Sequence, residues 1–162
     1  MCIRDRQQTL EKQEPFAAVL SCSDSRVPVE VVFDQTIGQL FVTRVAGNIV
    51  TAEILASLEY AAAVLGTNTI LVLGHSRCGA VTAVIQKTAV PGQISTLFPH
   101  IELAVEQAGP DLEATIRANA RIQAARLRAS SPLLTAMIEE GKLKITAGHF
   151  DIRTGAVTLL DA

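Results

Sequence analysis

A short run in the middle of the chain, residues 69–73 (TILVL), is almost wholly apolar. A strand that is apolar at every position is covered on both faces, which is typical of a parallel sheet packed between helices. Shorter apolar runs at residues 16–21 and 40–45 also indicate strands, and a helical pattern precedes or follows each run. The sequence therefore predicts an α/β fold with a mainly parallel β-sheet flanked by helices.

Helices are expected between and after these strands. Residues 51–65 are rich in Ala, Leu and Glu, with Thr51 placed as an N-cap. Residues 111–129 carry an apolar stripe at helical spacing, and residues 131–141 open with Ser-Pro, a helix-start signal. Weaker helical patterns cover residues 78–87 and part of 97–108, whereas residues 91–99, with two prolines and a glycine, are expected to form a loop.

The carboxyl-terminal part of the chain predicts an antiparallel edge strand. Residues 143–147 and 156–160 are expected to be strands, and Arg153-Thr154-Gly155 between them is a turn signal. The 162 residues suffice for one compact domain. Because 49% of the residues are hydrophobic but only 4% are aromatic, the core is expected to be aliphatic and rich in alanine.

Composition and charge exclude several classes of function. The formal net charge of −2 gives no basic field for nucleic acid or an anionic membrane, so neither is expected as a partner. No apolar run reaches the roughly 20 residues that span a bilayer. The charged first six residues have no apolar stretch behind them, so the expected compartment is cytoplasmic. The three cysteines are too few, and odd in number, for a disulfide framework.

Two short motifs bring together chemically reactive side chains. Residues 22–26 (CSDSR) follow the first expected strand, and residues 74–79 (GHSRCG) follow the buried third one. Ligands bind at the carboxyl ends of strands in open α/β sheets, so the two motifs are expected to converge. Cys22, His75 and Cys78 would then supply two thiolates and an imidazole. Zn²⁺ is well served by such donors, and three protein ligands leave its fourth position open for water.

Asp24 and Arg26 lie within the first motif and add a charged pair beside the expected metal. A carboxylate there can fill the open position on the metal or accept a hydrogen bond from its water. Arg26 would hold Asp24 in a bidentate ion pair and keep it ionised. Because a metal ion lowers the pKa of bound water to about 7, the site would supply hydroxide for a small electrophile such as CO₂.

Ordinary explanations exist for each of these residues. A cysteine after an apolar strand is commonly a small buried hydrophobe, and a histidine in a strand-to-helix turn is commonly a cap or a core hydrogen bonder. An Asp-x-Arg pair is commonly a local salt bridge. The residues alone leave these explanations open beside a catalytic zinc site. A structural zinc site is less favoured, because no fourth ligand is close in sequence: Cys2, His100 and His149 occur in other contexts.

The two motifs together resemble the signatures of the β-carbonic anhydrase family. Val27-Pro28 after the first motif adds to the resemblance, which runs from about Gln13 to Leu160. It implies reversible hydration of CO₂ to bicarbonate and a proton. The segments between the motifs are similar to the family as well: residues 33–35 (FDQ), 40–42 (LFV), 44–48 (RVAGN) and 57–60 (SLEY).

The resemblance also assigns roles to the motif residues. It implies that Zn²⁺ is bound by Cys22, His75 and Cys78. It implies that Asp24 either ligates the zinc, which closes the site, or moves onto Arg26, which leaves the zinc open. In the open state Asp24 would orient the attacking oxygen, and Arg26 would orient Asp24.

Four further residues match positions that line the substrate pocket in the family. Gln13 matches an amide that hydrogen-bonds the substrate, and Gly79 matches a backbone segment that approaches it. Phe41 and Tyr60 match apolar wall positions that a neighbouring subunit partly supplies, so a homo-oligomer (a dimer or a dimer of dimers) is expected. The alternative for Phe41 and Tyr60 is ordinary core packing, and for Gln13 it is an exposed loop.

One departure from the family concerns regulation. Some members hold a regulatory bicarbonate with a Trp, an Arg and a Tyr. Arg44 matches the Arg, whereas Val19 and Phe150 stand where the Trp and the Tyr would be. The regulatory site is therefore expected to be absent, and an open, water-bearing zinc site is expected at neutral pH.

A second departure concerns the N-terminus. Residues 1–12 are expected to be the remnant of an N-terminal helical arm that wraps a partner subunit in the family. Residues 1–6 do not resemble the family and are a candidate artefact of sequence assembly. Residues 13–162 are expected to form the single catalytic domain. A shortened arm is expected to weaken dimerisation.

Two alternative functions stay open. The same scaffold hosts hydrolysis of carbonyl sulfide or carbon disulfide, which are linear molecules like CO₂, and access to the pocket decides between these substrates. A non-catalytic zinc-binding or interaction protein is the alternative of a different class. The presence of both Asp24 and Arg26 argues against it, because a purely structural zinc site would need neither.

Overall fold

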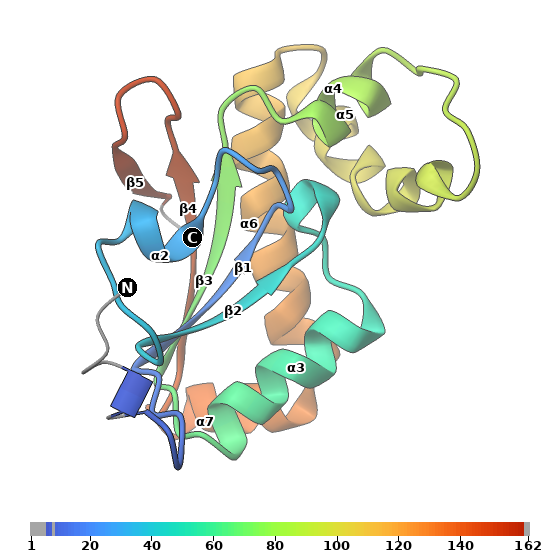
Figure 1. Cartoon of the computed structure of the whole chain (residues 1–162). Coiled ribbons are helices and arrows are strands. Elements are labelled where there is room, and N and C mark those ends of the chain that lie inside the picture. The colour runs from blue at the N-terminus through green and yellow to red at the C-terminus, as the bar shows by residue number, and fades with distance from the viewer. Residues whose placement is uncertain (1–5, 8, 161–162) are drawn as a thin grey trace.

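The fold is built on one central sheet. A computed structural model describes residues 6–7 and 9–160, and within them five strands form a sheet in the order β2-β1-β3-β4-β5 (Figure 1). The first four strands pair in parallel, and β5 pairs antiparallel to β4. The predicted α/β fold, mainly parallel with an antiparallel edge strand, is therefore confirmed. The strands are β1 (Ala17–Ser21), β2 (Leu40–Arg44), β3 (Thr69–His75), β4 (Lys144–Phe150) and β5 (Val157–Leu160).

Helices lie on both faces of this sheet. Three of them, α3, α6 and α7, pack on one face, and the short α2 packs on the other (Figure 1). In the same view α4 and α5 lie beyond the carboxyl end of β3. The helix bounds are α2 (Val29–Val32), α3 (Ala52–Ala63), α4 (Gly79–Ile85), α5 (Glu102–Ala108), α6 (Leu112–Ser130) and α7 (Pro132–Glu139), with 3₁₀ turns η1 (Ala46–Asn48) and η2 (Ile94–His100).

Alternate residues of the central strands point to opposite faces of the sheet, and both faces are buried. Leu20 and Val72 pack in the larger apolar cluster, which includes residues of α3, α6 and α7. Leu71 and Leu73 pack in a separate cluster with Val29 of α2. This two-sided burial is what the apolar run at the centre of the chain predicts.

Side-chain caps begin three of the helices. Thr51, Asp111 and Ser131 each accept a hydrogen bond from the backbone N–H three residues further on, at 3.5, 2.7 and 3.1 Å. A cap of this kind is worth about 1 kcal/mol because it satisfies an N–H group that has no partner within the helix. The predicted caps Thr51 and Ser131 are therefore confirmed.

The strand β4 is longer than the sequence indicates. The sequence predicts an end at Ala147, whereas β4 continues to Phe150. The additional residues pair with the end of β3, His149 opposite Gly74 and Phe150 opposite His75, and also with β5. A Gly-His pair is a weak strand signal on its own, and the two flanking strands make the extended conformation favourable. The extension carries β4 to the sheet edge where the two motifs lie.

Short helical turns account for the other differences. The turn η2 begins within residues 91–99, where a loop is expected, and continues to His100. The short elements α2 and η1 have no counterpart in the expectation. Leu97 and Phe98 of η2 pack against an apolar cluster that includes residues of α4. Short helical turns depend on such tertiary contacts, because one or two turns are unfavourable by themselves.

Two expectations concern parts of the chain outside the sheet. In residues 6–7 and 9–160, no helix combines the length and the apolar character needed to cross a membrane. The expected arm, residues 1–12, includes residues 1–5 and 8, which lie outside the described residues. The arm and the domain boundary at residue 13 stay predictions.

Candidate metal centre

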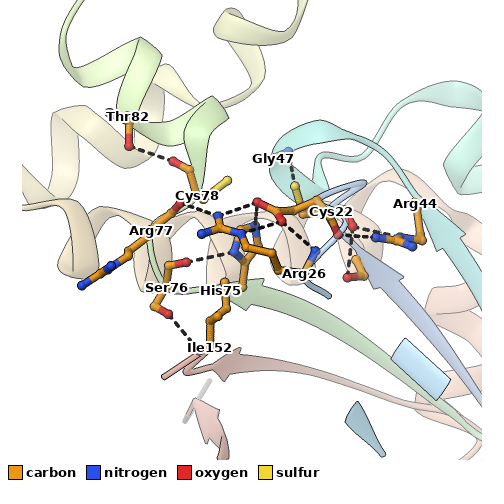
Figure 2. Close-up of polar contacts among 12 residues, drawn as sticks. Cys22, Arg26, Arg44, Gly47, His75, Ser76, Arg77, Cys78, Thr82 and Ile152 are labelled. Atoms are coloured by element: carbon orange, nitrogen blue, oxygen red, sulfur yellow. Dashed lines mark hydrogen bonds and ion pairs between the residues drawn. The ribbon is translucent and has the colours of Figure 1, made fainter. Parts of the chain in front are cut away.

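Three candidate metal ligands, here called the metal-ligand trio, meet at the carboxyl ends of β1 and β3. Cys22 directly follows β1, His75 is the last residue of β3, and Cys78 is the N-cap of α4. The two strands are parallel neighbours, which brings their carboxyl ends together. The ligand atoms of the trio lie within 4.8 Å of one another, and all three residues are buried (Figure 2). The structure thus places the predicted ligands in one group.

His75 offers one ring nitrogen to the trio. Its Nδ1 lies 3.0 Å from the carbonyl oxygen of Ser76, and because a carbonyl can only accept, Nδ1 carries the proton. The other nitrogen, Nε2, is buried and has no hydrogen-bond partner among the described residues. Such an atom costs about 1–3 kcal/mol when left unpaired, and a metal cation would remove that cost. Two sulfurs and one imidazole nitrogen fit a zinc ion.

Cys22 and Cys78 are free, buried thiols, and their side chains are hydrogen-bonded to each other. The hydrogen bond from the Cys78 thiol lowers the pKa of Cys22, against the opposing effect of burial. The same hydrogen bond, together with burial, raises the pKa of Cys78. The backbone N–H of Gly47 also donates to Cys22 Sγ at 3.3 Å. Cys22 thus reaches the thiolate form, which is the form that binds a metal ion, more readily than an ordinary cysteine.

Asp24 is held in place by Arg26. The guanidinium donates from Nε to Oδ1 at 2.9 Å and from Nη2 to Oδ2 at 2.7 Å, and the backbone N–H of Arg26 adds a third bond to Oδ1 at 2.9 Å. These hydrogen bonds hold the pKa of Asp24 well below its usual range, so the carboxylate is ionised at neutral pH. Its Oδ2 lies 3.9 Å from His75 Nε2, too far for a hydrogen bond. Asp24 therefore borders the trio in an orientation set by Arg26.

Arg44 fixes the loop that carries the first motif. Its guanidinium donates to the carbonyl oxygens of Cys22, at 3.0 Å, and of Asp24, at 2.6 Å (Figure 2). Arg26 in turn donates to the carbonyl oxygen of Arg77 at 3.2 Å, which joins the two motifs. The sequence indicates Arg44 only as part of a regulatory anion site. No local signal marks its role on the loop, because these contacts join residues 20 and 22 positions apart.

Gly47 is a second residue whose contribution the sequence does not single out. Its φ of +78° lies in the left-handed region, and a Cβ there would come within 2.8 Å of Ile101 Cδ1. In that conformation its N–H donates to Cys22 Sγ, and its carbonyl oxygen accepts from Asn119 Nδ2 at 2.9 Å. A glycine directly before an asparagine was the one available signal of a special backbone conformation.

Gln123 of α6 anchors the same loop to the core. It is fully buried; its Oε1 accepts from the Val50 N–H at 2.9 Å, and its Nε2 donates to His100 O at 2.8 Å and to Asn119 Oδ1 at 3.1 Å. The change Gln123→Leu keeps the side-chain volume but leaves these buried groups without partners. We expect the free energy of unfolding to fall by about 2–4 kcal/mol.

Urea denaturation of the purified variants measures this effect. Gln107→Leu, at an exposed position of α5, is the matched control and should change the free energy of unfolding by no more than about 0.5 kcal/mol. An unchanged midpoint for Gln123→Leu, or an equal loss in both variants, would show that the buried hydrogen bonds of Gln123 do not stabilise the loop.

One of the four predicted substrate-contacting residues lies at the trio. Gly79 begins α4 directly after Cys78, and a Cβ there would meet nothing within 4 Å outside its own helix. Gln13 is exposed before β1, and Phe41 is the second residue of β2, so both lie toward the amino ends of the strands. Tyr60 packs on Phe41 with ring centroids 6.4 Å apart. Contact of Gln13, Phe41 and Tyr60 with substrate therefore depends on a neighbouring subunit and stays a prediction.

Val19 and Phe150, the positions that bear on the regulatory site, are both buried. They pack in the apolar cluster between the sheet and α2. Neither side chain has a hydrogen-bonding group to offer a bicarbonate ion. The absence of the regulatory site remains a prediction, supported by these two residues.

Comparison with known proteins agrees with the geometry of the site. The family model described as carbonic anhydrase matches residues 17–157. Carbonic anhydrase 2 of Mycobacterium tuberculosis is 32% identical over 157 residues, which cover 92% of this chain and 76% of that protein. A carbonic anhydrase of Pseudomonas aeruginosa is 37% identical over 166 residues, covering 93% of this chain and 75% of that protein.

Solved structures share the fold. The β-carbonic anhydrase CcaA superposes with a TM-score of 0.88 at 28% identity, covering 98% of this chain and 79% of that one. A tetrameric β-carbonic anhydrase from Sordaria macrospora gives a TM-score of 0.86 at 25% identity, covering 96% and 85%. The matching family model, the similar relatives and the common fold show that this chain belongs to the β-carbonic anhydrase family.

Proposed function

We propose that the chain catalyses the zinc-dependent, reversible hydration of CO₂ to bicarbonate and a proton. One observation is central: an unpartnered, buried nitrogen of His75 lies within 4.8 Å of two free thiols, and an ionised carboxylate borders the group. A structural metal site needs ligands but no such carboxylate. The activity for which the relatives are named supports the same function.

Cys22, His75 and Cys78 would hold the zinc ion. When bound, Zn²⁺ supplies a Lewis acid that makes hydroxide available at neutral pH. Burial of the three side chains excludes bulk water and strengthens electrostatic interactions within the site. The Ser76 carbonyl fixes the tautomer of His75, and the Gly47 N–H holds the sulfur of Cys22, as outer partners of metal ligands commonly do.

Asp24 would orient the attacking oxygen. Because Arg26 keeps it ionised, Asp24 can only accept hydrogen bonds. By accepting the O–H of the attacking hydroxide, it turns a lone pair of that oxygen toward the carbon of CO₂. A new C–O bond then forms, and one C=O electron pair moves onto its oxygen to give bicarbonate. The proton that water lost in forming hydroxide leaves to buffer.

A homo-oligomer, a dimer or a dimer of dimers, would complete the substrate pocket. Gln13, Phe41 and Tyr60 lie away from the trio of their own chain. They would contact CO₂ or bicarbonate at the metal site of a neighbouring subunit. The similar Sordaria macrospora enzyme is tetrameric. Tyr60 is half exposed in the single chain, which leaves its ring available to a partner.

A cytoplasmic location suits the two ligand cysteines. Both are free thiols in the structure, and a reducing compartment keeps thiols available for metal binding. Nothing in the net charge of −2 favours binding to nucleic acid or to an anionic membrane surface.

Two rates measured on one zinc-loaded preparation test the proposed function. Stopped-flow hydration of CO₂ is expected to proceed with a kcat/KM in the range of about 10⁴–10⁸ M⁻¹s⁻¹, well above the rate of carbonyl sulfide hydrolysis. If carbonyl sulfide is turned over faster than CO₂, a sulfur-containing molecule is the preferred substrate and the proposed function is wrong. Zinc-loaded protein that is inactive on both would make a non-catalytic zinc-binding protein the better explanation.

A further inference from the structure

A cavity of about 540 Å³ opens beside the candidate metal centre. Among the described residues, neither the metal-ligand trio nor Asp24 lines it, whereas Arg26 lines it and also holds Asp24. Its lining includes one arginine from each of four segments: Arg26 after β1, Arg77 after β3, Arg117 on α6 and Arg153 in the turn between β4 and β5.

The two carboxylates that line this cavity are engaged by the protein. Glu113 accepts the backbone N–H of Arg77 at 3.2 Å and is bonded to Nε2 of the buried His149 at 3.0 Å. Asp151 accepts the backbone N–H of Arg153 at 2.8 Å. Burial lowers the pKa of His149, which keeps the ring neutral at neutral pH. Four arginines face two carboxylates, so the cavity carries a positive excess.

Three of the four guanidinium groups are available to a ligand. In the part of the chain that the structure describes, the side chains of Arg77, Arg117 and Arg153 make no hydrogen bond and no ion pair. Figure 2 shows the Arg77 side chain reaching away from Cys22 and Cys78. The planar fork of arginine binds carboxylate or phosphate groups through two parallel hydrogen bonds, which a lysine cannot do.

We propose that this arginine cavity binds a small organic oxyanion, a molecule that carries a phosphate group or two carboxylate groups. Its volume falls within the roughly 300–1,000 Å³ of small-molecule sites and exceeds what bicarbonate needs. Four like charges from four segments repel one another, and a dianion between them offsets that repulsion. A phosphate group and a carboxylate group have the same feature for recognition here: each presents two anionic oxygens to the guanidinium of an arginine.

Arg26 links the arginine cavity to catalysis. It lines the cavity and at the same time holds Asp24 through both carboxylate oxygens. An oxyanion in the cavity competes with Asp24 for this guanidinium and weakens the orientation of Asp24. A bound oxyanion is therefore an inhibitor of CO₂ hydration. This inhibition rests on the proposed function, whereas the binding of an oxyanion to the cavity does not.

Calorimetric titration of the zinc-loaded protein tests the binding. The probes are inorganic phosphate and succinate, which separate a phosphate ligand from a dicarboxylate. We expect at least one probe to bind saturably at one site per chain and to bind at least tenfold more weakly to Arg117→Ala and Arg153→Ala. Arg121→Ala, on the same helix but beside another pocket, is the charge-matched control and should bind like the parent. Equal affinity in all four proteins, or no saturable binding of either probe up to tens of millimolar, overturns the proposal.

Inhibition kinetics then separate the cavity from the metal. The bound probe should slow CO₂ hydration by the parent protein, and Arg117→Ala should keep the parental rate without probe while losing at least tenfold in sensitivity to it. Inhibition that is identical in both proteins would place the inhibitory oxyanion elsewhere and overturn the link through Arg26. If the protein hydrates no CO₂ at all, the proposed function fails, and the titration still decides whether the cavity binds oxyanions.

Discussion

Replacing Cys78 with serine is expected to abolish zinc retention and, with it, the hydration of CO₂. Serine keeps the shape of the side chain but replaces a soft thiolate with a neutral hydroxyl, which is a poor ligand for Zn²⁺. Only His75 and Cys22 would remain to hold the ion. Loss of an outer partner already costs 10- to 100-fold in metal affinity, so loss of a direct ligand should cost more than about 100-fold.

Zinc per chain, measured after dialysis against a chelator, gives the readout for Cys78→Ser. Cys2→Ser is the control. It makes the same chemical change at the third cysteine of the chain, which is not a proposed ligand, so the variant should retain zinc like the parent protein. Circular dichroism of each variant establishes that it is folded. Full zinc occupancy in folded Cys78→Ser would overturn the assignment of Cys78 as a ligand.

Asp24→Ala is expected to keep zinc and lose most of the hydration rate. The change leaves all three proposed ligands in place but removes the acceptor that would orient the attacking oxygen. It also leaves Arg26 without its bidentate partner. A positioned acid–base or hydrogen-bonding group contributes about 10²–10⁴-fold to a rate, and we expect kcat to fall within that range.

Zinc content and kcat, measured on the same sample of Asp24→Ala, show whether Asp24 binds the metal or orients the attacking oxygen. Zinc content should stay near the parental value in Asp24→Ala while kcat falls. Glu30→Ala, which removes an exposed carboxylate from α2, serves as the control and should leave both quantities unchanged. A parental rate in Asp24→Ala would make Asp24 a bystander, and loss of zinc would make it a ligand instead.

The sheet and the convergence of the motifs follow from local sequence patterns. The apolar run at residues 69–73 indicates a strand covered on both faces, and such strands belong to parallel sheets. Because ligands bind at the carboxyl ends of parallel strands, the residues that follow two such strands can be placed together from the sequence alone. Cys22, His75 and Cys78 meet for this reason, and Asp24 and Arg26 accompany Cys22 as near neighbours in sequence.

Contacts that join distant segments have no such local pattern. Arg44 and Gly47 hold the first motif from more than 20 positions away, and Gln123 reaches Val50 across 73 positions. The extension of β4 through His149 likewise depends on two flanking strands. The arginine cavity combines four segments, so neither its volume nor its charge can be inferred from any one of them.

Stepwise return of zinc to the chelated protein tests whether zinc bound to this chain is the source of CO₂ hydration. CO₂ hydration by stopped flow and zinc content are measured on each sample as the metal is added. We expect the chelated protein to be inactive and the rate to rise in proportion to zinc, with a maximum at one zinc per chain. A chelated protein that keeps its rate, or a fully loaded protein that does not hydrate CO₂, would show that the chain is not a zinc-dependent carbonic anhydrase.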